Sequence, residues 1–118
     1  MRINLEGARI SDMISMSRNR LGVGVVTLTG TFAIGPGSPH VLALDAGGSA
    51  RNVTLPANPR VGDWFYIINT TGSALVLTIQ DSAGGALTPA CTPTQNEMAF
   101  LIYLGATLGW KNIVGLGA

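Results

Sequence analysis

The amino-acid sequence predicts an all-β fold, a small antiparallel β-sandwich or barrel-like domain preceded by an N-terminal arm. From Val23 onward, short runs of β-branched and aromatic residues alternate with turns rich in Gly, Pro and Asn. No stretch combines helical periodicity with capping residues at both of its ends. Regular alternation of short strands and turns is typical of sandwiches and barrels.

The strongest turn signals divide the chain into strands. Residues 35–39 and 56–60 each contain two prolines, which cannot donate hydrogen bonds to a sheet. Adjacent glycines mark turns in segments 45–49 and 81–85, because glycine tolerates positive φ. Pro89 keeps its segment irregular or at a sheet edge. The expected strands are residues 23–32, 40–44, 52–55, 64–69, 74–80, 97–104 and 110–114.

Two of these strands are expected to pair as a hairpin. Residues 64–69 and 74–80 are separated by the four residues 70–73, a normal length for a hairpin connection. In the run 74–79 both alternating faces are largely apolar, as in a strand that is covered on two sides. Contact between subunits would supply the second cover.

The chain is expected to form one domain, residues 23–118, behind an arm of residues 1–22. The arm contains four of the seven basic residues, and its apolar residues follow neither a helical nor a strand period. It is either an arm that binds a partner or an ordinary first strand or frayed terminus. Candidate contact residues in it are Ile3, Leu5, Arg9, Arg18 and Arg20.

The low charge of the chain predicts an oligomer. Only 11% of the residues are charged, against roughly a quarter in ordinary soluble domains. Much of the surface is therefore apolar or neutral, and large apolar patches usually mark protein contacts. The formal net charge of +1 gives no general reason to expect nucleic acid as a partner.

The sequence also indicates a soluble protein of a reducing compartment. No run approaches the roughly 20 apolar residues of a spanning helix, so no membrane partner is expected. The first residues lack the pattern of a signal peptide. Cys91 is the single cysteine, which excludes an internal disulfide.

Few residues suit catalysis, and we expect no enzyme, no metal and no cofactor. His40 is the single histidine and follows a proline at the start of a strand, where a surface or loop position is expected. The three acids Asp45, Asp63 and Asp81 lie beside glycine turns, which their side chains commonly stabilise. A small carbohydrate-active enzyme that uses two of the six acids scattered along the chain stays an alternative, since its carboxylates need only converge in space.

The aromatic residues favour a core or subunit interface over ligand binding. Stacking on nucleic acid or sugar usually needs nearby basic or paired polar groups, and Lys111 is the only basic residue after Val61. Candidates for the core or for a trimer interface are Trp64, Tyr66, Leu75, Leu77, Phe100 and Trp110.

The order of these pieces resembles a known family of viral proteins. Residues 45–48 (DAGG), 52–56 (NVTLP), 61–63 (VGD) and 65–69 (FYIIN) are similar to β modules of tailed-bacteriophage virion proteins. The later segments 75–79 (LVLTI), 81–85 (DSAGG), 95–99 (QNEMA) and 109–111 (GWK) complete a resemblance to capsid decoration, or cement, proteins over residues 41–114.

This resemblance implies a non-enzymatic virion protein, made in the host cytoplasm and bound to the outer surface of the capsid. It implies a homotrimer that clamps neighbouring copies of the major capsid protein. The arm would then add a strand to an exposed edge on the capsid. Because similar modules occur in trimeric tail-fibre tips, a tail-fibre or tailspike tip that recognises a host surface is the alternative.

Overall fold

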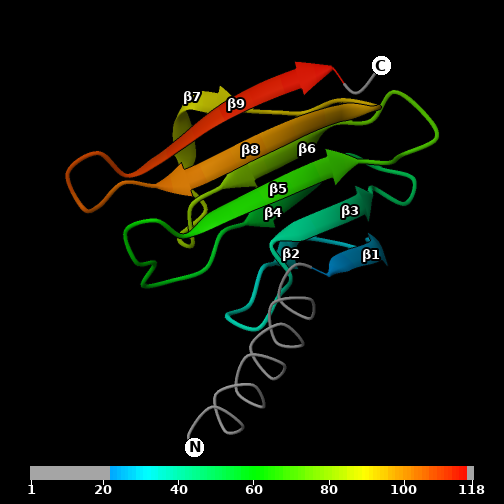
Figure 1. The fold of residues 1–118 in the computed structure, drawn as a ribbon. Coiled ribbons are helices and arrows are strands. Elements are labelled where there is room, and N and C mark those ends of the chain that lie inside the picture. The colour runs from blue at the N-terminus through cyan, green and yellow to red at the C-terminus, as the bar shows by residue number, and fades with distance from the viewer. Residues whose placement is uncertain (1–21, 117–118) are drawn as a thin grey trace, which may run out of the picture.

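The computed structural model describes residues 22–116 and confirms the all-β class (Figure 1). Two sheets contain all nine strands, and this part of the chain contains no helix. The strands are β1 (Val23–Thr27), β2 (Phe32–Ala33), β3 (Val41–Asp45), β4 (Arg51–Thr54), β5 (Trp64–Asn69), β6 (Leu77–Gln80), β7 (Ala86–Cys91), β8 (Glu97–Tyr103) and β9 (Trp110–Leu116).

The first six strands alternate between the two sheets. Sheet A has the order β1-β3-β5-β8-β9, and sheet B has the order β2-β4-β6-β7. The chain therefore crosses from one sheet to the other after each strand and returns one position further along, so that β1, β3 and β5 run parallel, as do β2, β4 and β6. Figure 1 shows the layers, with β5, β8 and β9 in front of β4 and β6.

The last three strands close the domain with antiparallel pairs. β7 turns back on β6, β8 pairs with β5, and β9 pairs with β8 over seven residues. β7 contains Pro89 and forms the edge of sheet B, as the proline predicts. The side-chain amide of Asn112 on β9 donates to the Pro89 carbonyl at 2.8 Å, which joins this edge to sheet A.

The structure corrects the predicted hairpin and the antiparallel pairing. β5 and β6 lie in different sheets and do not pair, because residues 70–76 carry the chain across the sandwich. The buried side chain of Asn69 fixes this crossing, since its amide donates to the carbonyls of Leu75 at 2.9 Å and Pro93 at 3.0 Å. Both sheets are mixed, with four parallel and three antiparallel pairings.

The core fills the space between the sheets. Leu42, Leu44 and Ile67 from sheet A meet Val53 and Leu77 from sheet B, and each of these side chains is at most 1% exposed. They alternate with outward residues along their strands, as the pleat of a strand requires. Trp110 packs against the same cluster at the start of β9.

The predicted acidic turns are confirmed. The Asp45 carboxylate accepts from the Gly47 N–H at 2.9 Å, and the Asp63 carboxylate accepts from the Arg60 N–H at 2.8 Å. Asp81 accepts from two backbone N–H groups of its own turn. Each of these carboxylates holds local backbone, which is the structural role that the sequence predicts for them.

Candidate interaction surface

One side of sheet A is apolar although it faces away from the core. Leu42 and Leu44 point into the sandwich, so their neighbours on β3 point outward, and the register carries this alternation across the sheet. A Cβ atom on Gly24 would come within 2.9 Å of Leu42, which places Gly24 on the inner side and its neighbours Val23 and Val25 on the outer side.

Three rows of paired residues form this outer face of sheet A. The central row is Val23, Val41, Tyr66, Phe100 and Ile113. The row on one side is Val25, Ala43, Ile68, Met98 and Gly115. The row on the other side is Trp64, Ile102 and Lys111. Lys111 is the one charged residue in these rows, and the next row begins with the polar pair Thr27 and Asp45.

The face is open to solvent at both of its edges. Val25 is 78% exposed on β1, Ile113 is 73% exposed on β9, and Phe100 is 38% exposed between them. Sheets with one solvated face normally alternate apolar and polar residues. The outer face of sheet A departs from that pattern, and exposed apolar patches usually mark protein contacts.

Aromatic rings stiffen one corner of this face. The His40 ring stacks on Trp64 with centroids 4.5 Å apart and planes at 18°, and Trp64 lies 6.2 Å from Phe100. His40 Nδ1 donates to the Trp64 carbonyl at 2.7 Å, which assigns the proton to that nitrogen. The half-buried His40 thus orients Trp64 from the bend that precedes β3, which agrees with the loop position expected for it.

The six residues predicted for the core or an interface separate into two groups. Trp64, Tyr66 and Phe100 belong to the outer face of sheet A. Leu77 and Trp110 are buried in the core, and Leu75 packs against it. The five candidate contact residues of the arm lie outside the described residues.

Sequence reasoning missed the extent of the outer face. It assigned two-sided cover to residues 74–79, whereas the strands that are apolar on both sides are β3, β5 and β8. The signal was present in the unbroken apolar runs at residues 64–68 and 98–102. A run that is apolar on both faces is the pattern of a strand covered twice.

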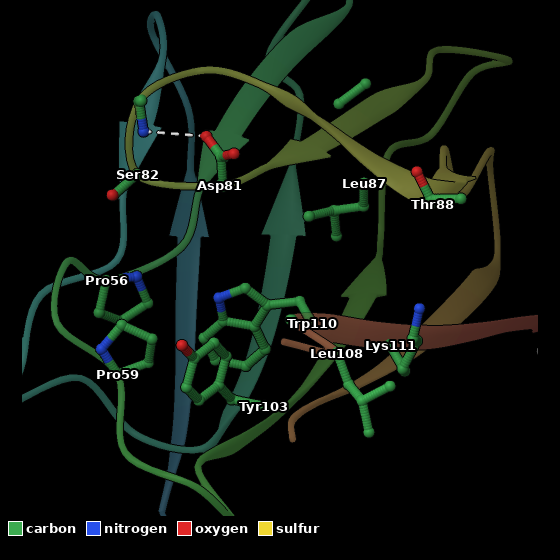
Figure 2. Close-up of a pocket in the computed structure, with 13 residues that line it drawn as sticks. Pro56, Pro59, Asp81, Ser82, Leu87, Thr88, Tyr103, Leu108, Trp110 and Lys111 are labelled. Atoms are coloured by element: carbon green, nitrogen blue, oxygen red, sulfur yellow. Dashed lines mark hydrogen bonds between the residues drawn. The ribbon is translucent and has the colours of Figure 1, made fainter. Parts of the chain in front are cut away.

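Two grooves lie on either side of the loop that contains Pro56 and Pro59. The first, of about 400 Å³, is shown in Figure 2, where Tyr103 and Trp110 lie beside these prolines and the Asp81 turn borders the opening. The dashed line in Figure 2 marks the hydrogen bond that the backbone N–H of Ala83 donates to the Asp81 carboxylate at 3.0 Å. The second groove, of about 660 Å³, lies between segments 35–40 and 56–60.

Residues 22–116 contain no group of three His, Cys, Asp or Glu side chains that could hold a metal ion. Burial raises the pKa of the Cys91 thiol to about 12, which keeps it neutral at physiological pH. Within the same residues, no helix has the length and apolar character to cross a membrane.

Comparison with known proteins supports the fold. No protein-family model matches the chain, and no curated protein is similar to it. A chain in a solved structure described as "Structure of a chaperone-substrate complex" is similar, with a TM-score of 0.50 and 21% sequence identity. The similarity covers 76% of the present chain and 17% of the other, so the present chain spans a small part of that protein's length.

Proposed function

We propose that this protein is a structural virion protein that binds the outer surface of a bacteriophage capsid as a homotrimer and clamps neighbouring copies of the major capsid protein. The observation that carries the proposal is the outer face of sheet A, where twelve of the thirteen residues in the three rows are uncharged. A domain with such a face is suited to protein contacts. The proposed role needs no catalytic residue and no cofactor.

The clamp works by multivalency and linkage. Three linked copies of one weak contact bind far more tightly than a single copy, because the second and third contacts form at a high effective concentration. A protein that binds only the assembled shell shifts the equilibrium toward that shell. Attachment of this kind therefore stabilises the capsid without chemical reaction.

The contact with the capsid is assigned to the N-terminal arm. An extended arm can add a strand to an exposed sheet edge, where backbone hydrogen bonds give affinity and alternate side chains give selectivity. Ile3 and Leu5 would supply apolar contacts, and Arg9, Arg18 and Arg20 would pair with acidic groups. In the structure, β1 begins at Val23 on the edge of sheet A, directly after the arm.

The test is cosedimentation of purified protein with preformed capsids that lack it. We expect the full chain to sediment with the capsids and to raise their melting temperature. Deletion of residues 1–20 should weaken binding, while circular dichroism of the free variant keeps its β signal. A full chain that stays in the supernatant would exclude the capsid role, and undiminished binding of the deletion variant would exclude the arm as the contact.

A tip domain of a trimeric tail fibre or tailspike is the second candidate. One observation favours it, since the similar solved chain is far longer than this one and contains the fold as a part. The two grooves beside Pro56 and Pro59 offer such a tip recessed surface for a host ligand. Electron microscopy of intact particles separates the candidates, because a decoration protein lies on the head and a tip lies on the tail.

A further inference from the structure

We propose that the outer face of sheet A is the surface through which copies of this chain associate, and that these faces together enclose a second hydrophobic core. This inference rests on the proposed function, because it states which surface forms the oligomer. It assigns Trp64, Tyr66 and Phe100 to contacts between copies, so that the contact with the capsid is made by other parts of the chain.

The composition of the face favours a second copy over a different partner. Interfaces of permanent homo-oligomers resemble a domain core that has been cut in half, with few charged residues. The face has that composition, with valine, isoleucine and aromatic side chains and the single charge of Lys111. A partner that binds transiently is usually steered and selected by complementary charges, which this face lacks.

The shape of the face also suits a second copy. Two sheets pack face to face about 10 Å apart when both contribute apolar side chains. In a trimer, the outer faces of the other two copies supply the apolar side chains against which each sheet packs. Because closed symmetry is the rule for homo-oligomers, the copies can bury these faces around one axis without leaving an open surface for further growth.

The flat area of the face approaches what a specific interface requires. Five strands about 4.8 Å apart, with about five residues of 3.3 Å rise each, span roughly 24 by 17 Å, or about 400 Å² of flat area. Two such faces give about 800 Å² before the relief of the side chains is counted, against the about 1,000 Å² that a biological interface exceeds. Exposed in a monomer, this patch would promote aggregation.

The first experiment measures mass by analytical ultracentrifugation of the full chain and two matched variants. Val25→Lys places a charge on the outer face, and Val61→Lys places the same charge on a loop off that face. Val25 and Val61 are 78% and 73% exposed, so the two substitutions change the size and the solvation of the side chain equally. We expect the wild type and Val61→Lys to have the mass of three 12.2 kDa chains, and Val25→Lys to dissociate at least about tenfold more readily.

The second experiment measures how strongly association protects a cysteine on the outer face of sheet A from a thiol reagent, with substitutions that leave the contact between copies intact. Cys91 is buried, so in Ile113→Cys and Val61→Cys variants the introduced thiol is the more accessible one. Both positions are 73% exposed within one chain. A maleimide should label Val61→Cys rapidly and Ile113→Cys at least about tenfold more slowly, and both equally in denaturant.

The outcomes separate this inference from the capsid role. A monomeric wild type, an unchanged mass for folded Val25→Lys, or equal labelling of the two cysteines would overturn the assignment of the outer face. If Val25→Lys fails to fold, the labelling ratio decides alone. Capsid cosedimentation of the wild type is measured separately, so that an oligomer that binds no capsid rejects the proposed function and retains the interface.

Discussion

The side-chain carbonyl of Asn69 accepts two hydrogen bonds from Thr71, one from its backbone N–H at 3.0 Å and one from its hydroxyl. Both residues are buried, and the Thr71 hydroxyl oxygen also accepts from the Ala46 N–H at 2.9 Å. The Asn69 amide group in turn holds the Leu75 and Pro93 carbonyls. One side chain thus joins the end of β5 to the crossing segment and to the chain that precedes β8.

Replacing Asn69 with alanine should destabilise the protein by about 2–4 kcal/mol, because it leaves several buried polar groups without partners. Urea denaturation followed by tryptophan fluorescence measures the free energy of unfolding. The control is Asn52→Ala at an exposed position of β4, which should change stability by less than about 0.5 kcal/mol. Equal effects of the two substitutions would show that the Asn69 network contributes nothing specific.

This network explains why the sequence predicted the strands better than their pairing. The bounds of the strand at residues 64–69 were predicted correctly, because Gly62-Asp63 and Thr70 frame an unbroken apolar run. The hairpin was wrong because residues 74–76, which were expected to begin the second strand, belong to the seven-residue connection 70–76 that crosses to the other sheet. Contacts of Asn69 with Pro93, 24 residues away, select the crossing, and local sequence patterns do not encode them.

The outer face of sheet A was only partly predictable for a similar reason. Apolar residues on both faces of a strand indicate two-sided cover, but they do not reveal which chain supplies it. Trp64, Tyr66 and Phe100 could be named as core or interface from the sequence, and only the strand register separates them from the buried Trp110. Register depends on pairing between segments that are distant in the chain.

Trp110→Ala should lower the free energy of unfolding by about 3–5 kcal/mol, the usual cost of removing a large buried aromatic side chain. The Trp110 ring is 7% exposed and lies 5.4 Å from Tyr103 and 6.1 Å from Phe65, measured between centroids. Thermal unfolding followed by far-ultraviolet circular dichroism reports the loss. An unchanged melting temperature would contradict the placement of Trp110 in the core.

Trp64→Ala supplies the matched control for the other tryptophan. Trp64 is half-buried on the outer face of sheet A, so its loss within a single folded chain should cost less than the loss of Trp110. Measurements at low protein concentration keep any effect on association small. A larger loss for Trp64→Ala than for Trp110→Ala under these conditions would reverse the assignment of the two residues.

Gly47→Ala should destabilise the turn between β3 and β4 by about 1–3 kcal/mol, through strain in the backbone and a steric clash. Gly47 has φ of 74°, and a Cβ atom there would lie 2.1 Å from the Leu28 carbonyl oxygen. Gly37→Ala is the control, because a Cβ atom at that position meets nothing within 4 Å. Chemical denaturation measures the stability of both variants. A Gly37→Ala variant that is less stable than the Gly47→Ala variant would contradict the prediction.

Cys91 should make stability depend on pH in the alkaline range. The folded protein raises the thiol pKa to about 12, whereas an unfolded cysteine titrates near about 8.5. Below the unfolded pKa the thiol is neutral in both states, and its contribution to stability is fully present. As the pH rises toward the folded pKa, only the unfolded chain loses the proton, so stability falls by up to about 1.4 kcal/mol per pH unit from this group.

Cys91→Ala isolates this effect from the other groups that titrate at high pH. Because alanine leaves a small gap in the core, the variant should be less stable than the wild type near about pH 7, by roughly 1 kcal/mol. Above about pH 8.5 the wild type loses the thiol contribution and the variant does not. The difference in the free energy of unfolding between the two proteins should therefore narrow and then change sign by about pH 10. Urea denaturation of both proteins across this range measures this difference in the free energy of unfolding. A difference that stays constant would show that the Cys91 thiol ionises as easily in the folded protein as in the unfolded chain.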